Sequence, residues 1–224
     1  MISRRLRKIT PGVLDDILTR LDAATILDRF RRAGGLLEGH FRLTSGLHSS
    51  GYLQCALVLQ HPSEAEACGA AIAERVRGLG AQVVLSPALG GIVIGHEVAR
   101  ALGIRAMFAE RQDGRLMLRR GFALEPGEQV LVVEDVVTTG GSTRETIDVA
   151  RAAGAVVVGA AAIIDRSGGR PSTELGVALS GSKGRQSLDV PFYSLVEVSL
   201  PTYEPESCPL CLAGQPVVKP GSRT

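Results

Sequence analysis

Two adjacent carboxylates and a hydroxyl-rich turn form the most informative stretch of the chain. Glu134 and Asp135 follow an apolar run over 130–133, and the sequence Thr-Thr-Gly-Gly-Ser occupies 138–142. Glycines let backbone N–H groups turn inward, hydroxyls add donors, and the start of a following helix favours an anion. Such a turn predicts a monophosphate site. The carboxylates would repel that phosphate, so we expect them to bind the vicinal hydroxyls of a ribose.

The turn does not match two common nucleotide-binding patterns. No Gly-Lys-Ser/Thr follows the glycines, as a Walker A loop requires, and the GxGxxG spacing is missing. In an open α/β sheet, ligands bind at the carboxyl ends of the strands, where this turn should lie. A purely structural cap at the start of the helix is the alternative interpretation.

Strands and helices alternate around this turn. Near-continuous apolar runs predict buried strands, and helical spacing closed by glycine predicts the helices between them. This alternation is typical of an α/β fold with a parallel sheet covered on both faces. Ser63 is the predicted N-cap of the first of these helices, because Glu66 completes a capping box. The predicted strands are 82–86, 104–109, 129–133 and 156–164, and the predicted helices are 63 to about 80, 91–102 and 142–153.

The two ends of the chain have a different pattern. Helical spacing over 11–33 predicts two short helices, with Asp22 as a break or cap between them. Short β-rich stretches follow over 36–59. The tail from Pro201 is rich in Pro, Gly and Ser, and we expect it to be irregular.

Composition excludes several classes of protein. The 224 residues suit one compact domain, and 25 Lys and Arg against 23 Asp and Glu leave a net charge of +2, so nucleic acid is not the expected partner. No apolar run reaches the roughly 18 residues of a membrane span, and the basic N-terminus lacks the apolar region of a signal peptide. Four cysteines do not make a disulfide scaffold, so we expect a reduced, cytoplasmic protein with no membrane partner.

The full string over 130–143 resembles the 5-phosphoribosyl-1-pyrophosphate (PRPP) motif of type I phosphoribosyltransferases. Three further segments narrow the resemblance to the orotate phosphoribosyltransferases. Residues 39–54 are similar to the family's N-terminal base-binding region, 87–92 to its pyrophosphate loop and 164–169 to its orotate-binding strand end. The resemblance covers roughly residues 34–200 in the family's order.

This resemblance implies a fold, a reaction and partners. The fold is a central, mostly parallel sheet flanked by helices, with a small N-terminal hood. Within one structural domain, residues 1–60 would form helices and the base-binding hood, 61–200 the core and 201–224 the irregular extension. The implied reaction transfers the phosphoribosyl group of PRPP to N1 of orotate, giving orotidine 5-monophosphate and pyrophosphate in pyrimidine biosynthesis. Mg²⁺ would be held mainly by PRPP and water, and the family forms homodimers with shared active sites.

The resemblance also implies roles for individual residues. Glu134 and Asp135 would hold the ribose hydroxyls, and Arg111 would contact pyrophosphate, in the family from the neighbouring subunit. Arg115 belongs to a mobile loop over 112–121 that covers the leaving group.

Arg166 would meet the orotate carboxylate; a surface arginine paired with Asp165 is the alternative. Ala88 and Leu89 would form the pyrophosphate loop, where a non-proline cis peptide is common in the family. The remaining implied substrate-binding residues are Tyr52, Leu53, Val136, Val137, Thr138, Thr139, Gly140, Gly141 and Ser142.

Three positions depart from the family pattern. Thr44 and Gly90 stand where many members carry lysine, and the loop over 112–121 offers Arg115, Arg119 and Arg120 in place of lysine and histidine. Arginine stays charged near neutral pH, so these side chains can neutralise pyrophosphate but cannot donate a proton.

Two rival functions stay open, and so does the question whether Cys208 and Cys211 bind a metal ion. A non-enzymatic PRPP sensor would keep the fold, and a purine phosphoribosyltransferase would keep the phosphate loop without needing Arg166. Cys208 and Cys211 have the spacing of a zinc knuckle, but a closed zinc site needs four ligands, so the predicted site contains no metal ligand. For the four histidines we expect surface or packing roles: His40, His48, His61 and His96.

Overall fold

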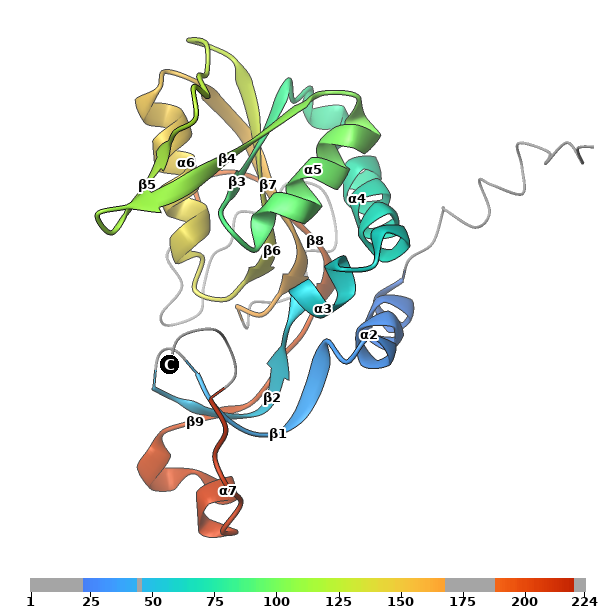
Figure 1. Ribbon diagram of the computed structural model, residues 1–224, viewed down its shortest axis with the longest axis vertical. Helices are drawn as coiled ribbons and strands as arrows, with labels where there is room; N and C mark the ends of the chain where they lie inside the picture. The colour runs from blue at the N-terminus through green and yellow to red at the C-terminus, as the bar shows by residue number, and fades with distance from the viewer. Residues whose placement is uncertain (1–21, 44–45, 168–187, 220–224) are drawn as a thin grey trace, which may run out of the picture.

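The computed structural model of the protein describes residues 22–43, 46–167 and 188–219. Its largest element is a six-stranded sheet in the order β5-β4-β3-β6-β7-β8 (Figure 1). All neighbouring strands run parallel except β5, which pairs antiparallel with β4. The predicted α/β class is therefore confirmed. The strands are β3 (Val83–Pro87), β4 (Arg105–Gln112), β5 (Arg115–Leu118), β6 (Gln129–Val137), β7 (Val156–Asp165) and β8 (Phe192–Glu197).

Helices cover both faces of this sheet, as the continuous apolar strands require. Successive residues of β3 alternate between two hydrophobic clusters: Val84 packs with the helices of one face, and Val83 and Leu85 pack toward α6 on the other. Figure 1 shows α4 and α5 on one side of the sheet and α6 on the opposite side. The first face is covered by α2 (Ala23–Arg32), α3 (Cys55–Leu59), α4 (Pro62–Val76) and α5 (Gly91–Leu102), and the second by α6 (Gly141–Ala152).

The boundaries of the predicted helices agree with the structure within a few residues, with one error in capping, but α3 lies at the end of the 36–59 stretch that was wrongly expected to be β-rich throughout. The α4 helix begins at Pro62, its N-cap is His61, and no side chain caps it. Ser63 therefore lies inside the helix, and its assignment as N-cap is wrong. Proline has a fixed φ that suits the first helical position, which moves the start of the helix forward. Asp22 caps α2 as expected, since its Oδ1 accepts a hydrogen bond from Thr25 N at 2.7 Å.

A second, three-stranded sheet forms the hood. In it β1 (Leu36–Arg42) pairs antiparallel with β2 (His48–Leu53), and β2 pairs with β9 (Thr202–Tyr203). Figure 1 shows this sheet at one end of the large sheet. After β9 come the turn η2 (Pro205–Ser207) and the short helix α7 (Pro209–Leu212). The expectation of an irregular tail is wrong for this stretch, because the free edge of β2 recruits β9 as a strand.

The segment expected as a mobile loop over 112–121 contains a β-hairpin. β4 extends to Gln112, the dipeptide Asp113-Gly114 makes the turn, and β5 returns along β4. Asp-Gly strongly favours such two-residue turns. Leu116 of β5 is buried in the hydrophobic cluster on the α6 face of the large sheet, which fixes the side of the hairpin that faces inward.

Some predictions fall on residues that the structure does not describe. These are the first N-terminal helix over 11–21, Thr44, positions 168–169 of the orotate-binding strand end, and the last residues from 220 onward. Among the described residues, no helix is both long and apolar enough to cross a membrane.

Candidate active site

The order of the strands places the site. From β3 the chain moves outward to β4, whereas from β6 it moves in the opposite direction to β7 and β8. The carboxyl ends of β3 and β6 therefore flank the point where the winding direction changes, and open α/β sheets bind ligands at that point. The Ala88-Leu89 loop follows β3, and Glu134 and Asp135 lie on the last part of β6. The structure thus brings the predicted pyrophosphate loop beside the predicted ribose site.

Gly90 and Asp135 show how closely these segments approach. A Cβ atom added to Gly90 would lie 2.9 Å from both carboxylate oxygens of Asp135. A lysine here would force the loop or the carboxylate to shift, which gives a structural reason for this departure from the family pattern. The peptide bond between Ala88 and Leu89 is cis, as expected, and the Leu89 side chain is 84% exposed.

The two carboxylates are poorly solvated. Glu134 is buried, and desolvation, followed by the charge of Asp135, raises its pKa to about 9. Desolvation also raises the pKa of Asp135, despite a hydrogen bond from Val136 N to its Oδ1 at 2.8 Å. A hydroxyl donor or a cation beside this pair would stabilise the ionised forms.

The phosphate loop has the geometry of an anion site. Gly140, at the N-cap of α6, has φ +76°, a left-handed conformation that side-chain-bearing residues adopt with strain. Thr138 and Thr139 are exposed in the turn before it. Arg144 reaches back over the turn and donates from its NH2 to Thr139 O at 3.0 Å, which adds a cation near the helix N-terminus. Thr143 is only 1% exposed, so its hydroxyl is enclosed in the core and is not a phosphate donor.

A cavity of about 620 Å³ lies between the phosphate loop and the hood. Six of the predicted substrate-binding residues line it: Tyr52, Leu53, Val136, Thr138, Thr139 and Arg166. Three more lining residues, Leu43, Leu47 and Ser167, lie in segments that were predicted to bind the base, whereas Ser199, Leu200 and Thr202 were not predicted. The cavity therefore has one wall from the large sheet and another from the hood and the segment beside it.

Arg166 follows the last residue of β7 and lines the cavity. Its NH2 donates to Ser49 Oγ at 3.1 Å, and the Ser49 hydroxyl donates to Pro201 O at 2.9 Å. The alternative pairing with Asp165 is not seen among the described residues: no carboxylate acts on the Arg166 guanidinium, and Asp165 Oδ1 accepts from Ser167 N at 2.9 Å. Burial lowers the pKa of Arg166, so a ligand carboxylate would relieve a desolvated cation.

Two of the predicted residues that do not line the cavity are the arginines of the β4–β5 hairpin. Arg111 is in the β4–β5 hairpin, where its NH2 pairs with Glu145 Oε2 of α6 at 2.8 Å. The same carboxylate accepts from Leu116 N at 2.7 Å, so Glu145 ties the hairpin to α6. Arg115 is exposed at the start of β5. Neither arginine lines the cavity of its own chain among the residues described.

Sequence reasoning missed Ser49, Arg144 and the residues that follow β8. Arg144 had a usable signal, because it lies in the first turn of the helix after the phosphate loop. Ser49 lies in the predicted base-binding region 39–54, but its pairing with Arg166 had no signal, since the two residues are 117 positions apart.

Comparisons with known proteins agree with this geometry. A family model described as "Phosphoribosyl transferase domain" matches residues 56–175, more than half of the chain. The chain is 51% identical over 201 residues to the orotate phosphoribosyltransferase of Heliobacterium modesticaldum, covering 89% of this chain and 97% of that protein. It is 50% identical over 194 residues to that of Pelotomaculum thermopropionicum, covering 87% of this chain and 94% of that protein.

The fold also resembles a solved structure. The Mycobacterium tuberculosis orotate phosphoribosyltransferase, determined in complex with inorganic phosphate, superposes with a TM-score of 0.59 at 21% identity, covering 79% of this chain and 95% of that chain. At this identity the likeness bears on the fold, and the sequence relatives identify the family. The chain belongs to the phosphoribosyltransferase family and, within it, to the orotate phosphoribosyltransferases.

Proposed function

We propose that this protein transfers the 5-phosphoribosyl group of PRPP to N1 of orotate, giving orotidine 5-monophosphate and pyrophosphate for pyrimidine synthesis. The observation that carries the proposal is that the phosphate-loop residues Thr138 and Thr139 and the half-buried Arg166 line the same cavity. One wall suits a sugar phosphate and the other suits a base that carries a carboxylate. Relatives about 50% identical over most of the chain are named for this activity.

The phosphate loop would hold the 5-phosphate of PRPP. Backbone N–H groups at the start of α6 face the loop, and the hydroxyls of Thr138, Thr139 and Ser142 add donors. Arg144 adds positive charge beside them. Because α6 and β6 are packed into the sheet, the loop would fix the sugar from one end.

Glu134 and Asp135 would accept hydrogen bonds from the ribose hydroxyls. The C1–pyrophosphate bond breaks first, an oxocarbenium-like ribose develops, and N1 of orotate attacks C1. A carboxylate beside the sugar stabilises that developing positive charge, so catalysis rests on positioning and electrostatics and needs no protein nucleophile.

The donor set at this end of β6 also fits Mg²⁺. Two neighbouring carboxylates with raised pKa values offer hard oxygen ligands or outer-sphere acceptors for its water molecules. When bound with PRPP, Mg²⁺ supplies positive charge for the pyrophosphate and ribose oxygens. The Ala88-Leu89 loop would enclose the pyrophosphate from the other side.

Arg166 would bind the orotate carboxylate with two parallel N–H···O hydrogen bonds, the geometry that a guanidinium favours. Ser49 holds the guanidinium in place through its NH2 group. Tyr52, Leu53 and Leu200 would cover the faces of the base. A purine phosphoribosyltransferase has no use for a cation at this position, so Arg166 favours the orotate reaction over that rival.

We also propose a homodimer in which Arg111 or Arg115 serves the neighbouring subunit's site. Both arginines lie outside the cavity wall of their own chain, which supports action across a subunit boundary. Mixing Asp135→Asn protein with Arg111→Ala protein should restore part of the activity through hybrid dimers. No recovery after verified subunit exchange would show that each site is self-contained.

Free thiols on all four cysteines support a reducing compartment such as the cytoplasm.

The proposed function is tested by supplying purified protein with PRPP, Mg²⁺ and one base at a time. We expect pyrophosphate release with orotate and little with uracil or adenine. Faster release with adenine would identify a purine enzyme, and PRPP binding without turnover on any base would identify a sensor.

A further inference from the structure

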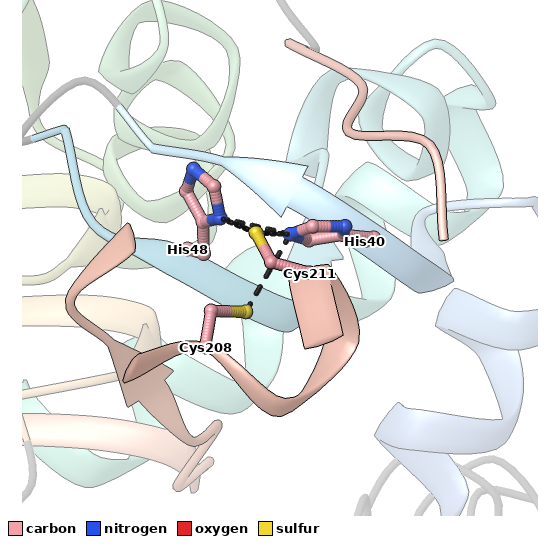
Figure 2. A group of neighbouring side chains, drawn as sticks. All are labelled: His40, His48, Cys208 and Cys211. Carbon is pink, nitrogen blue, oxygen red and sulfur yellow. Dashed lines mark hydrogen bonds between the residues drawn. The ribbon is translucent and has the colours of Figure 1, made fainter. Parts of the chain in front are cut away.

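Four metal-ligating side chains meet outside the cavity. His40 and His48 come from the facing strands β1 and β2, whereas Cys208 and Cys211 flank the start of α7. Their ligand atoms all lie within 4.8 Å of one another. Figure 2 shows the four side chains directed toward a common centre.

The separations fit a tetrahedral metal ion. With zinc–sulfur and zinc–nitrogen bonds of about 2.3 and 2.05 Å, tetrahedral geometry puts sulfur and nitrogen ligands about 3.6 Å apart. His40 Nε2 lies 3.6 Å from Cys208 Sγ and 3.7 Å from Cys211 Sγ, and His48 Nδ1 lies 3.3 Å from Cys211 Sγ. The two ring nitrogens are 2.8 Å apart, so they need to separate by about 0.5 Å to match zinc geometry.

The hydrogen bonds of His40 leave its other nitrogen available as a ligand. Nδ1 is 2.8 Å from Gln215 O, and a carbonyl can only accept, so Nδ1 carries the proton and Nε2 carries a lone pair. Metal-bound histidines usually have such a backbone partner, which fixes the ring orientation. His48 Nδ1, Cys208 Sγ and Cys211 Sγ all approach this lone pair, which can accept only one hydrogen bond. A cation at the centre resolves that competition.

The C-terminal segment has almost no hydrophobic core of its own. Between residues 201 and 219, Cys208 is the only buried residue, and Leu212 is 81% exposed. His40 and His48, by contrast, are buried under this segment, at 4% and 7% exposed. Small units that cannot bury enough apolar surface are commonly held by a metal or a disulfide, so the four residues lie where such a cross-link is needed.

We propose that His40, His48, Cys208 and Cys211 bind one structural Zn²⁺ ion that fastens the C-terminal segment to the β1–β2 hairpin. Two thiolates and two neutral imidazoles balance the charge of the ion and close its coordination shell. Thiolate and imidazole ligands select zinc over hard cations such as Mg²⁺. This site supplies the two partners that Cys208 and Cys211 lack in the sequence, and it replaces the surface or packing roles expected for His40 and His48.

The zinc site would also support the wall of the cavity. His48 immediately precedes Ser49, the partner of Arg166, and β9 pairs with both residues through Tyr203 and Thr202. Thr202 itself lines the cavity. Releasing the metal should therefore loosen the hood wall and weaken orotate binding more than PRPP binding. This consequence rests on the proposed function, whereas zinc binding itself does not.

Metal content gives the first test. Full-length protein made without a histidine tag should contain one zinc per chain by elemental mass spectrometry. Cys211→Ser and His48→Asn should each lose most of it. Two control variants should keep their zinc: Cys68→Ala removes a buried thiol of α4, and His96→Gln removes a histidine that is 68% exposed. Zinc in the wild type no higher than in a Cys208→Ser/Cys211→Ser double variant would overturn the proposal, as would stoichiometric iron in place of zinc.

Cobalt substitution keeps the test decisive if a variant fails to fold. Chelated wild-type protein titrated with Co²⁺ should develop the intense visible absorption of a tetrahedral ion and a thiolate charge-transfer band, both saturating at one equivalent. Weak octahedral absorption, or a disulfide between Cys208 and Cys211 in protein kept under reducing conditions, would refute the site. If the metal binds but chelation leaves the Michaelis constant (KM) for orotate unchanged, the structural zinc stands and its link to the cavity fails.

Discussion

Residues 130–133 lead into the phosphate loop fully buried in the large sheet, whereas strand β1 of the hood is mostly exposed or half-buried and the buried residues of β2 include the polar His48 and Ser49. The carboxylates and the phosphate loop belong to one continuous segment of chain that runs from the last part of β6 to the start of α6. The hood wall of the cavity combines segments near residues 50, 166 and 200. The groups of the first region are therefore positioned by contacts within one packed segment. The groups of the hood wall are positioned by a few contacts between residues far apart in the sequence.

From this difference we expect the two regions to control different kinetic constants. Groups on the large sheet are held firmly enough to stabilise a developing charge, so changes there should lower the catalytic rate (kcat). Groups that join the sheet to the hood select the base, so changes there should raise KM for orotate. Substitutions that separate the two kinetic constants therefore test the comparison.

The largest effect is expected for Asp135→Asn. An amide keeps the size of the side chain but removes the charge beside the ribose, which should lower kcat by about 10²–10³-fold. Asp148→Asn on the exposed side of α6 is the matched control and should keep the wild-type rate. Steady-state kinetics with thermal unfolding separates the chemical effect from misfolding. Near-normal turnover of folded Asp135→Asn protein would remove the role given to this carboxylate.

Arg166→Ala should act mainly on orotate. Charge-assisted hydrogen bonds contribute about 1.5–3 kcal/mol each, so KM for orotate should rise by at least about tenfold. KM for PRPP should change little. Arg166→Lys restores the charge without the planar fork and should recover only part of the loss. Titrating both substrates against both variants checks this, and equal weakening of the two would mean that Arg166 supports the fold.

The buried Glu134 should make the ligand-free protein less stable as pH rises. Its folded pKa of about 9 lies above the ordinary value of 4.5, so the folded state keeps a proton that the unfolded state loses between these pH values. Stability from this group is therefore complete below about pH 4.5 and declines toward pH 9, by at most about 1.4 kcal/mol per pH unit. Urea unfolding across this range should show the decline, and Glu134→Gln should flatten it. An equal slope in that variant would assign the effect to other groups.

Ser49→Ala should give the smallest effect, and it tests the contact between the hood and Arg166 of the large sheet directly. It removes one hydrogen bond to Arg166 and one to Pro201 O, each with a net contribution of about 1 kcal/mol. KM for orotate should rise several-fold with kcat nearly unchanged. Ser50→Ala, at the next position of β2, is the control. A loss of kcat with no change in KM would place Ser49 with the catalytic groups. It would contradict the expectation that contacts of the hood act on orotate binding alone.

The predictable part of the molecule follows the same division. Apolar runs and closing glycines located α5, α6 and four of the five parallel strands because each signal lies within the element that it predicts, whereas β8 was not predicted. The phosphate loop was predictable because its groups are contiguous in the chain. The β4–β5 hairpin had a local signal too, the dipeptide Asp113-Gly114. The segment was nevertheless expected to be a mobile loop, because the family that the sequence resembles has one there.

The hood could not be assembled from the sequence in the same way. β9 has only two residues, and its strand conformation depends on the free edge of β2, about 150 positions earlier. The same separation hid the cluster of His40 and His48 with Cys208 and Cys211. Long-range contacts of this kind leave no periodicity in the sequence, so only the folded chain reveals them.

The role of Arg166 in base selection is tested most directly by the discrimination between orotate and uracil, expressed as the ratio of their kcat/KM values. These bases differ in the carboxylate that Arg166 is proposed to bind. We expect a large ratio for the wild-type protein and a much smaller one for Arg166→Ala, caused by lower kcat/KM for orotate and little change for uracil. A variant that keeps the wild-type ratio while losing activity on both bases would contradict this expectation.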